Sequence, residues 1–226
     1  MNVSELFHKT VDMLRGHTEV TLDQSILNDP VSSSVIAKAE LLMGMPLSDD
    51  IRDFYLQANG FTIKWLLEKS NSSSFLSGWI DVWPLEKMIG GEYADQGLED
   101  IEIEKAFEEI LILDNDSEEE RAELCKHRVL ESYNGLSSYT TLRFSKYDGV
   151  SLHYTDSYRP LEISTIPLSF SEYIKFVFES LGADGCRQAL KEKDFFVNPY
   201  EFYPELKAIK NEFPATDLHR ISAFGK

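Results

Sequence analysis

The hydrophobic pattern changes its period at Asn59-Gly60, and this change limits the possible folds more than any other feature of the sequence. Before it, apolar residues recur at spacings of three and four, as on one face of a helix that Ser48 caps: Ile51, Phe54, Tyr55 and Ala58. After it, apolar residues alternate with polar ones, as along a half-buried strand: Phe61, Ile63 and Trp65, with Thr62 and Lys64 between them. Gly60 is expected to end the helix in the left-handed conformation. Helices followed by a run of strands predict an α+β fold.

Two more helices are predicted nearer the N-terminus. Residues 2–15 place apolar side chains at helical spacing, which predicts an amphipathic opening helix. The next helix is expected to have Asp29 as its N-cap and Pro30 at its first position, and to stop at Gly44.

Several segments further along have the composition of strands. Together with residues 61–65 they predict a mostly antiparallel, twisted sheet of about five to six strands packed against helices. The segments are Leu76–Val82, Glu109–Leu113, His127–Tyr133, Tyr139–Phe144 and Val150–Tyr154. Pro84 ends the first of them, and Asp148-Gly149 joins the last two as a type I′ hairpin turn.

Alternation along Leu76–Val82 sorts its side chains onto two faces. Trp79 and Trp83 fall on the face opposite Ile80 and Val82. We expect Ile80 and Val82 to face the main core.

The chain is expected to return to helix after the strands. Ser169 and Glu172 have the spacing of a capping box, and Gly182 is expected to stop that helix. Shorter helices are predicted near residues 185–193 and 205–211, with aromatic residues as packing anchors: Phe195, Phe196, Tyr200, Phe202, Tyr203 and Phe213. The predicted organisation is an N-terminal helical extension (1–30), an α+β domain (31–182) and a C-terminal helical extension packed on it (183–226).

The formal net charge is −17, from 39 acidic and 22 basic residues. A field of this sign repels phosphates and anionic lipid and speeds encounter with basic proteins, so we expect neither nucleic acid nor membrane as a partner. The N-terminus lacks the apolar stretch of a signal peptide, which predicts a cytoplasmic protein. Cys125 and Cys186 have no disulfide or metal spacing and are expected to be free thiols.

The sequence contains none of the common nucleotide, hydrolase or zinc-protease motifs. Asp114-Asn115-Asp116 begins like a calcium loop, but its sixth and twelfth positions are Glu119 and Cys125, which cannot supply the required Gly and bidentate Glu. The five histidines are scattered. A catalytic role for His153 requires that it meet Cys125 or an acid in space, and a surface or half-buried structural histidine is the simpler interpretation. We therefore expect no enzyme activity, no cofactor and no metal.

The segment Glu99–Glu123 holds twelve acidic residues against Lys105 and Arg121. It is interpreted either as a solubilising insertion or as a steering patch for a basic partner. In the second case the partner-binding residues are Glu99, Asp100, Glu102, Asp114, Asp116, Glu118, Glu119 and Glu120.

Several short motifs together resemble the SUKH superfamily. The opening motif matches at Glu40, Gly44, Leu47, Asn59 and Gly60, with Met43 in place of the usual Leu and Ser48 in place of the usual Pro. Gly78, Trp79 and Pro84 resemble the family's second strand and the turn that follows it. The resemblance covers about residues 33–182, and residues 1–30 and 183–226 fall outside it.

This resemblance implies an α+β protein-binding module without a cofactor. The superfamily contains bacterial immunity proteins of toxin systems and fungal SMI/KNR-type cell-wall-synthesis regulators. We expect a monomeric immunity protein that occludes a basic nuclease- or deaminase-type toxin. A regulatory scaffold of the SMI/KNR type and an enzyme that uses Asp81 or Asp114 are the alternatives.

Overall fold

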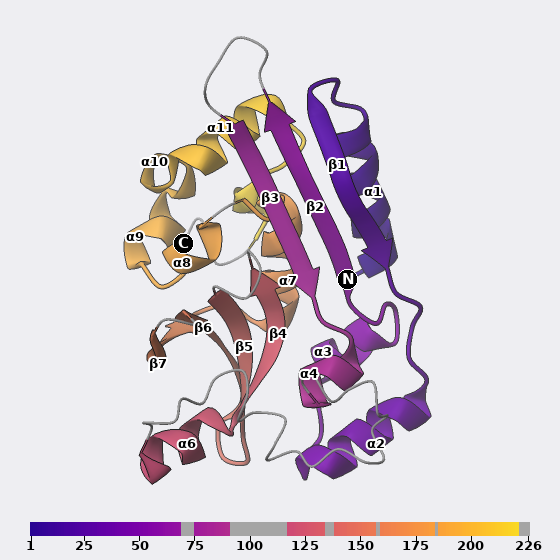
Figure 1. The fold of residues 1–226 in the computed structure, drawn as a ribbon, viewed down its shortest axis with the longest axis vertical. Coiled ribbons are helices and arrows are strands. Elements are labelled where there is room, and N and C mark those ends of the chain that lie inside the picture. Colours follow the sequence, from indigo (N-terminus) through magenta and orange to yellow (C-terminus); the bar gives the residue numbers. More distant parts are fainter. Residues whose placement is uncertain (69–74, 91–116, 134–137, 157–158, 184, 222–226) are drawn as a thin grey trace. The chain divides into compact units, whose positions relative to one another are not determined.

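The chain forms an α+β fold in a computed structural model that describes residues 1–226 except 69–74, 91–116, 134–137, 157–158, 184 and 222–226 (Figure 1). Seven strands hydrogen bond in sequence order, with antiparallel neighbours: β1 (Val20–Leu27), β2 (Phe61–Glu68), β3 (Phe75–Val82), β4 (His127–Tyr133), β5 (Ser138–Ser145), β6 (Gly149–Asp156) and β7 (Arg159–Ile166). The predicted α+β class is confirmed, and the strand number is slightly higher than expected because β1 and β7 were not predicted.

Helices precede and follow the strands. Those before or between them are α1 (Val3–Arg15), α2 (Ser33–Met43), α3 (Asp49–Tyr55), α4 (Leu85–Gly90) and α6 (Glu118–Leu124). Those after them are α7 (Phe170–Glu179), α8 (Cys186–Ala189), α9 (Lys193–Val197), α10 (Pro199–Phe202), α11 (Pro204–Glu212) and the 3-10 turn η2 (Leu218–Arg220).

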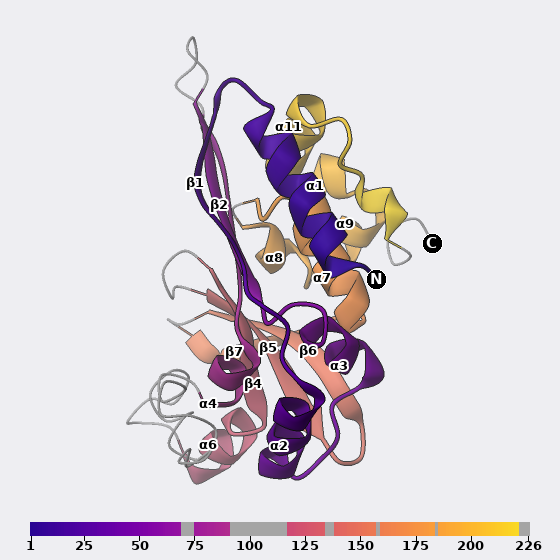
Figure 2. The same cartoon turned by 90° about the vertical axis from the view of Figure 1, so that its right-hand side faces the viewer.

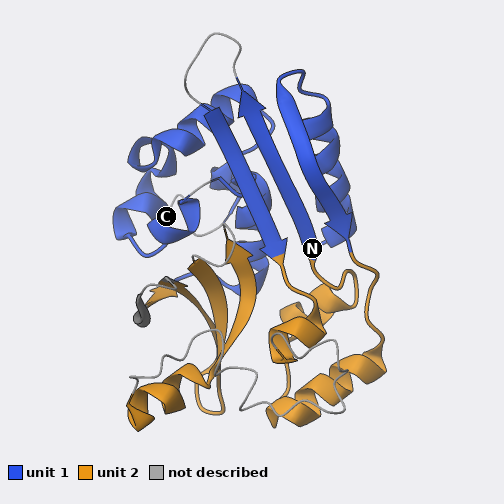
Figure 3. Cartoon of the chain, viewed as in Figure 1, with its two compact units in different colours: residues 1–27, 61–81, 166–226 blue, residues 28–60, 82–165 orange. Residues whose placement is uncertain are grey.

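The chain divides into two compact units (Figure 3). The first unit comprises residues 1–27, 61–81 and 166–226, and the second comprises residues 28–60 and 82–165. These units group the chain differently from the predicted extensions and central domain, which stay a prediction. In particular, residues 1–30 contain a strand, β1, in addition to the expected helix α1.

The first unit packs helices on one side of its strands. Figure 2 shows α1, α7 and α11 on the same side of β1 and β2. The alternation in β2 buries every second residue, and Phe61 stacks on Phe178 with ring centroids 4.8 Å apart. Ile80 is buried in this unit at 0% exposure, and Val82, where the second unit resumes, is 1% exposed, which confirms that this side of β3 faces the core. Trp79 on the other side is half-buried, with the Lys64 ammonium 3.7 Å from its ring centroid.

The aromatic residues of the C-terminal segment serve mainly as core in this unit. Phe195 and Phe213 are buried, at 0% and 2% exposure. Phe202 is 42% exposed, yet its ring packs edge to face on Phe195 with centroids 5.9 Å apart, so it also serves as a packing residue. Helix α7 begins with the predicted capping box, in which Ser169 and Glu172 exchange side-chain and backbone hydrogen bonds.

The second unit gives structural contacts to the residues of the opening motif. The Glu40 carboxylate accepts hydrogen bonds from the Leu47 backbone N–H (3.0 Å) and from Arg52 (2.5 Å), which hold the 44–48 loop against α2. Asn59 accepts from the Leu85 N–H (2.7 Å) and donates to Glu86 (2.9 Å). These contacts brace the starts of α3 and α4.

Gly60 lies at a close approach of two backbone segments. Its φ of 77° is left-handed, and a Cβ at this position would collide with the carbonyl oxygen of Val82. The side chain of any other residue would therefore force the backbone around Trp83 and Pro84 to move.

Two predicted helix boundaries need correction. Helix α2 begins at Ser33 with Ser32 as its cap, because the Val31 N–H donates to the Tyr55 carbonyl and keeps the Asp29-Pro30 stretch out of the helix. Helix α3 ends at Tyr55 with Leu56 as C-cap, so Gly60 turns the chain into β2 and does not close the helix.

The β5–β6 hairpin is confirmed, but its turn is not type I′. Ser145 pairs with Gly149, which leaves three residues between the strands, and Gly149 has positive φ whereas Asp148 does not. The predicted strand Glu109–Leu113 and the connection 71–74 lie outside the described residues. Cys125 and Cys186 are free thiols, as expected.

Candidate functional site

Most of the net charge belongs to the second unit. Its residues include 24 Asp and Glu against 10 Lys and Arg, a net charge of −14, whereas the first unit has 15 against 12, a net charge of −3. A surface that attracts basic partners is therefore to be sought on residues 28–60 and 82–165.

Helix α6 carries the described part of the predicted acidic surface. Ser117 caps it, and its hydroxyl accepts from the Glu120 N–H while the Glu120 carboxylate accepts from the Ser117 N–H at 2.8 Å. The Ser117 backbone donor, the largest influence, holds the pKa of Glu120 below its usual range. Glu120 thus closes a capping box and stabilises the first turn of the helix.

The other end of α6 is fastened to the sheet. Leu124 is buried in a cluster with Trp83, Val129 and Tyr139. The Glu123 carboxylate binds Arg143 Nε at 2.6 Å and Lys126 Nζ at 2.5 Å. The hydrogen bond from Arg143, followed by that from Lys126, lowers the pKa of Glu123 to about 2. The helix is therefore held by packing and by an ion pair that keeps its charge down to low pH.

These contacts leave Glu118 and Glu119 facing solvent. Both side chains are exposed, and neither forms an ion pair with any residue that the structure describes. Of the eight predicted partner-binding residues, the structure thus brings Glu118, Glu119 and Glu120 together on one helix. Glu99, Asp100, Glu102, Asp114 and Asp116 lie outside the described residues.

Strands β4, β5 and β6 carry a buried polar cluster that sequence reasoning did not predict. The His127 and His153 rings meet edge to face with centroids 5.0 Å apart, and both residues are buried. His127 Nδ1 lies 3.0 Å from the Thr141 hydroxyl, and the strand register places Thr141 opposite His153. Finding this pair requires the register of β4, β5 and β6, because the two histidines are far apart in sequence.

Burial keeps both histidines neutral. Desolvation, followed by the charges of His153 and Arg143, lowers the pKa of His127 to about 3 against an attraction from Glu123. The pKa of His153 is also lowered, first by desolvation and then by Arg143. The cluster is therefore a set of neutral groups satisfied by hydroxyls.

His153 and Ser151 have one feature of a hydrolytic site. His153 Nε2 lies 2.9 Å from the Ser151 hydroxyl, as a base lies from a nucleophile. Its Nδ1, however, faces the Thr165 hydroxyl at 3.5 Å, where a triad requires a carboxylate to orient the ring. The pair has the geometry of a structural hydrogen bond.

The two acids of the enzyme alternative lie apart from this cluster. Asp81, in the first unit, accepts from the Thr62 hydroxyl at 2.8 Å, and Asp114 lies outside the described residues. Over the described part of the chain, no three His, Cys, Asp or Glu side chains group as metal ligands.

Among the helices of the described ranges, none combines the length and apolar character needed to cross a membrane. A comparison with models of protein families found no match, and a comparison with curated proteins found none either.

Proposed function

We propose that this chain is a non-enzymatic, cytoplasmic protein-binding module of the immunity type, which occludes a basic protein through the acidic surface of its second unit. The partner class is a toxin domain whose Lys and Arg side chains otherwise hold an anionic substrate such as nucleic acid. Glu118 and Glu119 are the described contact residues, and Asp and Glu of the 99–116 stretch are proposed to extend the surface.

The observation that carries this proposal is the presentation of Glu118 and Glu119. A capping box at one end of α6 and Leu124 with Glu123–Arg143 at the other fix the helix without using these two carboxylates. The helix that carries these two carboxylates is already ordered. Binding a partner through them therefore costs little conformational entropy. They also stand in a unit with a net charge of −14, which favours encounter with a basic surface.

The resemblance of residues 33–182 to the SUKH superfamily supports a protein partner over a small-molecule substrate. The hydrogen bonds of Glu40 and Asn59 and the close backbone approach at Gly60 support a structural role for the shared motif, which leaves specificity to other surfaces. Segments between elements of a rigid scaffold vary most readily, and the acidic segment lies between β3 and β4.

The test compares capture of partners from the native cells by three proteins. These are the wild type, the Glu118→Lys/Glu119→Lys variant and a matched control, Glu201→Lys/Glu205→Lys, whose acids also lie exposed in first helical turns but in the first unit. We expect one basic protein to be captured by the wild type and the control and lost from the variant.

A second arm tests immunity itself. Expression of the captured protein alone should stop growth, and co-expression of the wild-type chain but not the Glu118→Lys/Glu119→Lys variant should restore it. A captured partner that is harmless when expressed alone contradicts the immunity role and favours the regulatory scaffold. Equal capture by wild type and variant contradicts the assignment to α6.

A further inference from the structure

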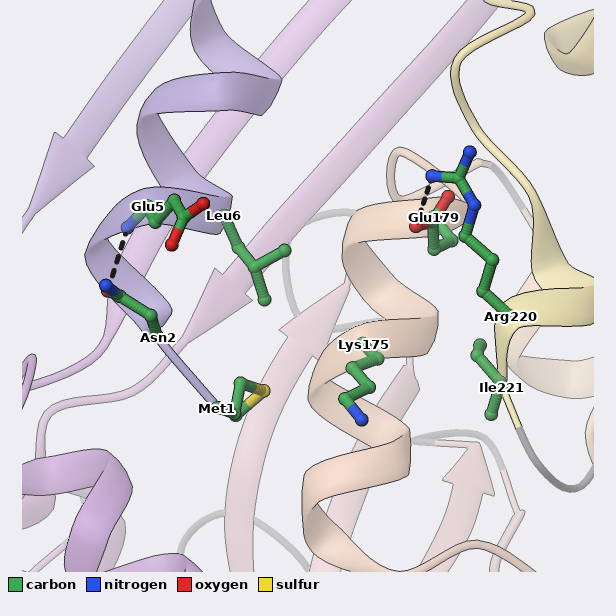
Figure 4. Close-up of a pocket in the computed structure, with 8 residues that line it drawn as sticks. All are labelled: Met1, Asn2, Glu5, Leu6, Lys175, Glu179, Arg220 and Ile221. Atoms are coloured by element: carbon green, nitrogen blue, oxygen red, sulfur yellow. Dashed lines mark hydrogen bonds and ion pairs between the residues drawn. The ribbon is translucent and has the colours of Figure 1, made fainter.

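A cavity of about 300 Å³ opens in the first unit beside the first turn of α1 (Figure 4). The side chains of Met1 and Leu6 on one side and Ile221 on the other give it apolar walls, and α7 lies between them. This volume is at the lower end of the range for small-molecule sites, which limits an occupant to a compact molecule.

One pair of charges in the wall is already committed to the fold. The Glu179 carboxylate accepts from the Asp217 backbone N–H at 2.5 Å and lies 3.5 Å from Arg220 Nη1. These contacts fix the η2 turn on α7 and so fix the position of Ile221. Arg220 keeps further N–H donors, because its guanidinium has five.

Two other charges in the wall remain available. Glu5 comes from α1 and Lys175 from α7, and neither side chain forms an ion pair with another described residue. Figure 4 shows Leu6 and Met1 in the space between these two helices. The cavity therefore offers the Lys175 ammonium group, the Glu5 carboxylate, the remaining donors of Arg220 and an apolar surface at the same time.

We propose that this cavity binds a small zwitterion with an apolar side chain, that is, a free apolar α-amino acid. Its carboxylate pairs with Lys175, its ammonium group pairs with Glu5, and its side chain lies against Leu6, Met1 and Ile221. A simple anion meets the repulsion of Glu5, and a simple cation that of Lys175, so only a ligand with both charges satisfies both groups.

This site is independent of the proposed basic partner, because its residues all belong to the first unit. It adds a small-molecule site to a protein whose other proposed surface binds protein.

Calorimetric titration of the full chain with three related probes tests the proposal. The probes are L-leucine, 4-methylpentanoate, which lacks the ammonium group, and 3-methylbutylamine, which lacks the carboxylate. We expect L-leucine to bind about tenfold more tightly than either analogue, as the loss of one charged contact of modest strength predicts. Equal affinities for L-leucine and 4-methylpentanoate, or no binding of L-leucine below about 10 mM, overturn the proposal.

Two variants assign the charges. Lys175→Met keeps the aliphatic stem, so it should abolish the preference for L-leucine over 3-methylbutylamine while the preference over 4-methylpentanoate persists. Glu5→Gln should have the reverse effect. Lys207→Met on α11, an exposed lysine outside the cavity, is the control and should bind all three probes as the wild type does. Unchanged preferences in both Lys175→Met and Glu5→Gln overturn the assignment.

Discussion

Replacement of His127 by Asn should flatten the dependence of stability on pH between 7 and 5. His127 is 1% exposed and has a lowered pKa of about 3, mainly because burial disfavours its charged form. In the unfolded chain the imidazole titrates at its ordinary pKa of 6.5. The unfolded state therefore binds the proton more tightly than the native state. Stability from this group is complete above pH 6.5 and is lost as the pH falls toward 3.

The magnitude follows from the two pKa values. At pH 5 protonation of the unfolded chain favours unfolding by about 2 kcal/mol, whereas the native state gains almost nothing. His153 adds a loss of the same sign, because its pKa is lowered as well. The pH interval lies above the ordinary range of Glu and Asp, so paired carboxylates such as Glu123 contribute little to the slope.

The assay is urea unfolding followed by circular dichroism at pH 7, 6 and 5 for the wild type and two variants. His127→Asn can keep a hydrogen bond to Thr141 and lowers stability at pH 7 through lost packing, but its pH slope should be smaller by about 2 kcal/mol over the interval. His8→Asn, on the exposed face of α1, is the control for the loss of a histidine. Parallel slopes for His127→Asn and the wild type would refute the account of a neutral, buried His127.

The Glu118→Lys/Glu119→Lys variant should melt close to the wild type, whereas adding Glu120→Lys should lower the melting temperature, because only Glu120 closes the capping box. Equal melting of the double and triple variants in a calorimeter would show that the box does not stabilise α6. Association with the captured basic partner should slow steeply with added salt once the Debye length falls to about 10 Å. An association rate constant that does not change with ionic strength in stopped-flow measurements would contradict electrostatic steering. Ile80→Asp should cost several kcal/mol, since Ile80 is 0% exposed and a carboxylate there has no partner. Wild-type melting of that protein would contradict the placement of β3.

The sequence predicts those elements best whose signals are local. The capping box of Ser169 and Glu172 marks the start of α7, and strict alternation marks β2. Strand β1 escaped prediction because a bulge at Asp23 shifts its register, so Val20 and Leu22 share a face with Ser25 and not with the residues that simple alternation selects.

The sequence does not predict strand β7, for a different reason. Its second residue is Pro160, which cannot donate to a sheet and argues against a central strand, yet β7 is the last strand in the order and a sheet edge tolerates proline.

The candidate site shows the same division between local and distant signals. Charge density alone identified Glu118 and Glu119 as candidates. The structural role of Glu120 follows from Ser117 three residues earlier, because this spacing is that of a capping box. The contacts of Glu123 with Arg143 and of His127 with His153 join different elements, so no short-range sequence pattern predicts them.

The division into two units has a consequence for biosynthesis. The second unit ends at residue 165, so all of its residues are synthesised before residues 166–226, which make up more than half of the first unit. Helix α1 is synthesised before both units are complete. Its apolar face, with Val3, Phe7, Val11 and Leu14 buried in the folded protein, belongs to a unit that includes residues 166–226. During translation that face cannot be fully covered until the C-terminal helices are made. A nascent chain that exposes apolar surface is a target for chaperones and is prone to aggregation. The apolar face of α1 is thus made well before the C-terminal helices of the unit in which it is buried.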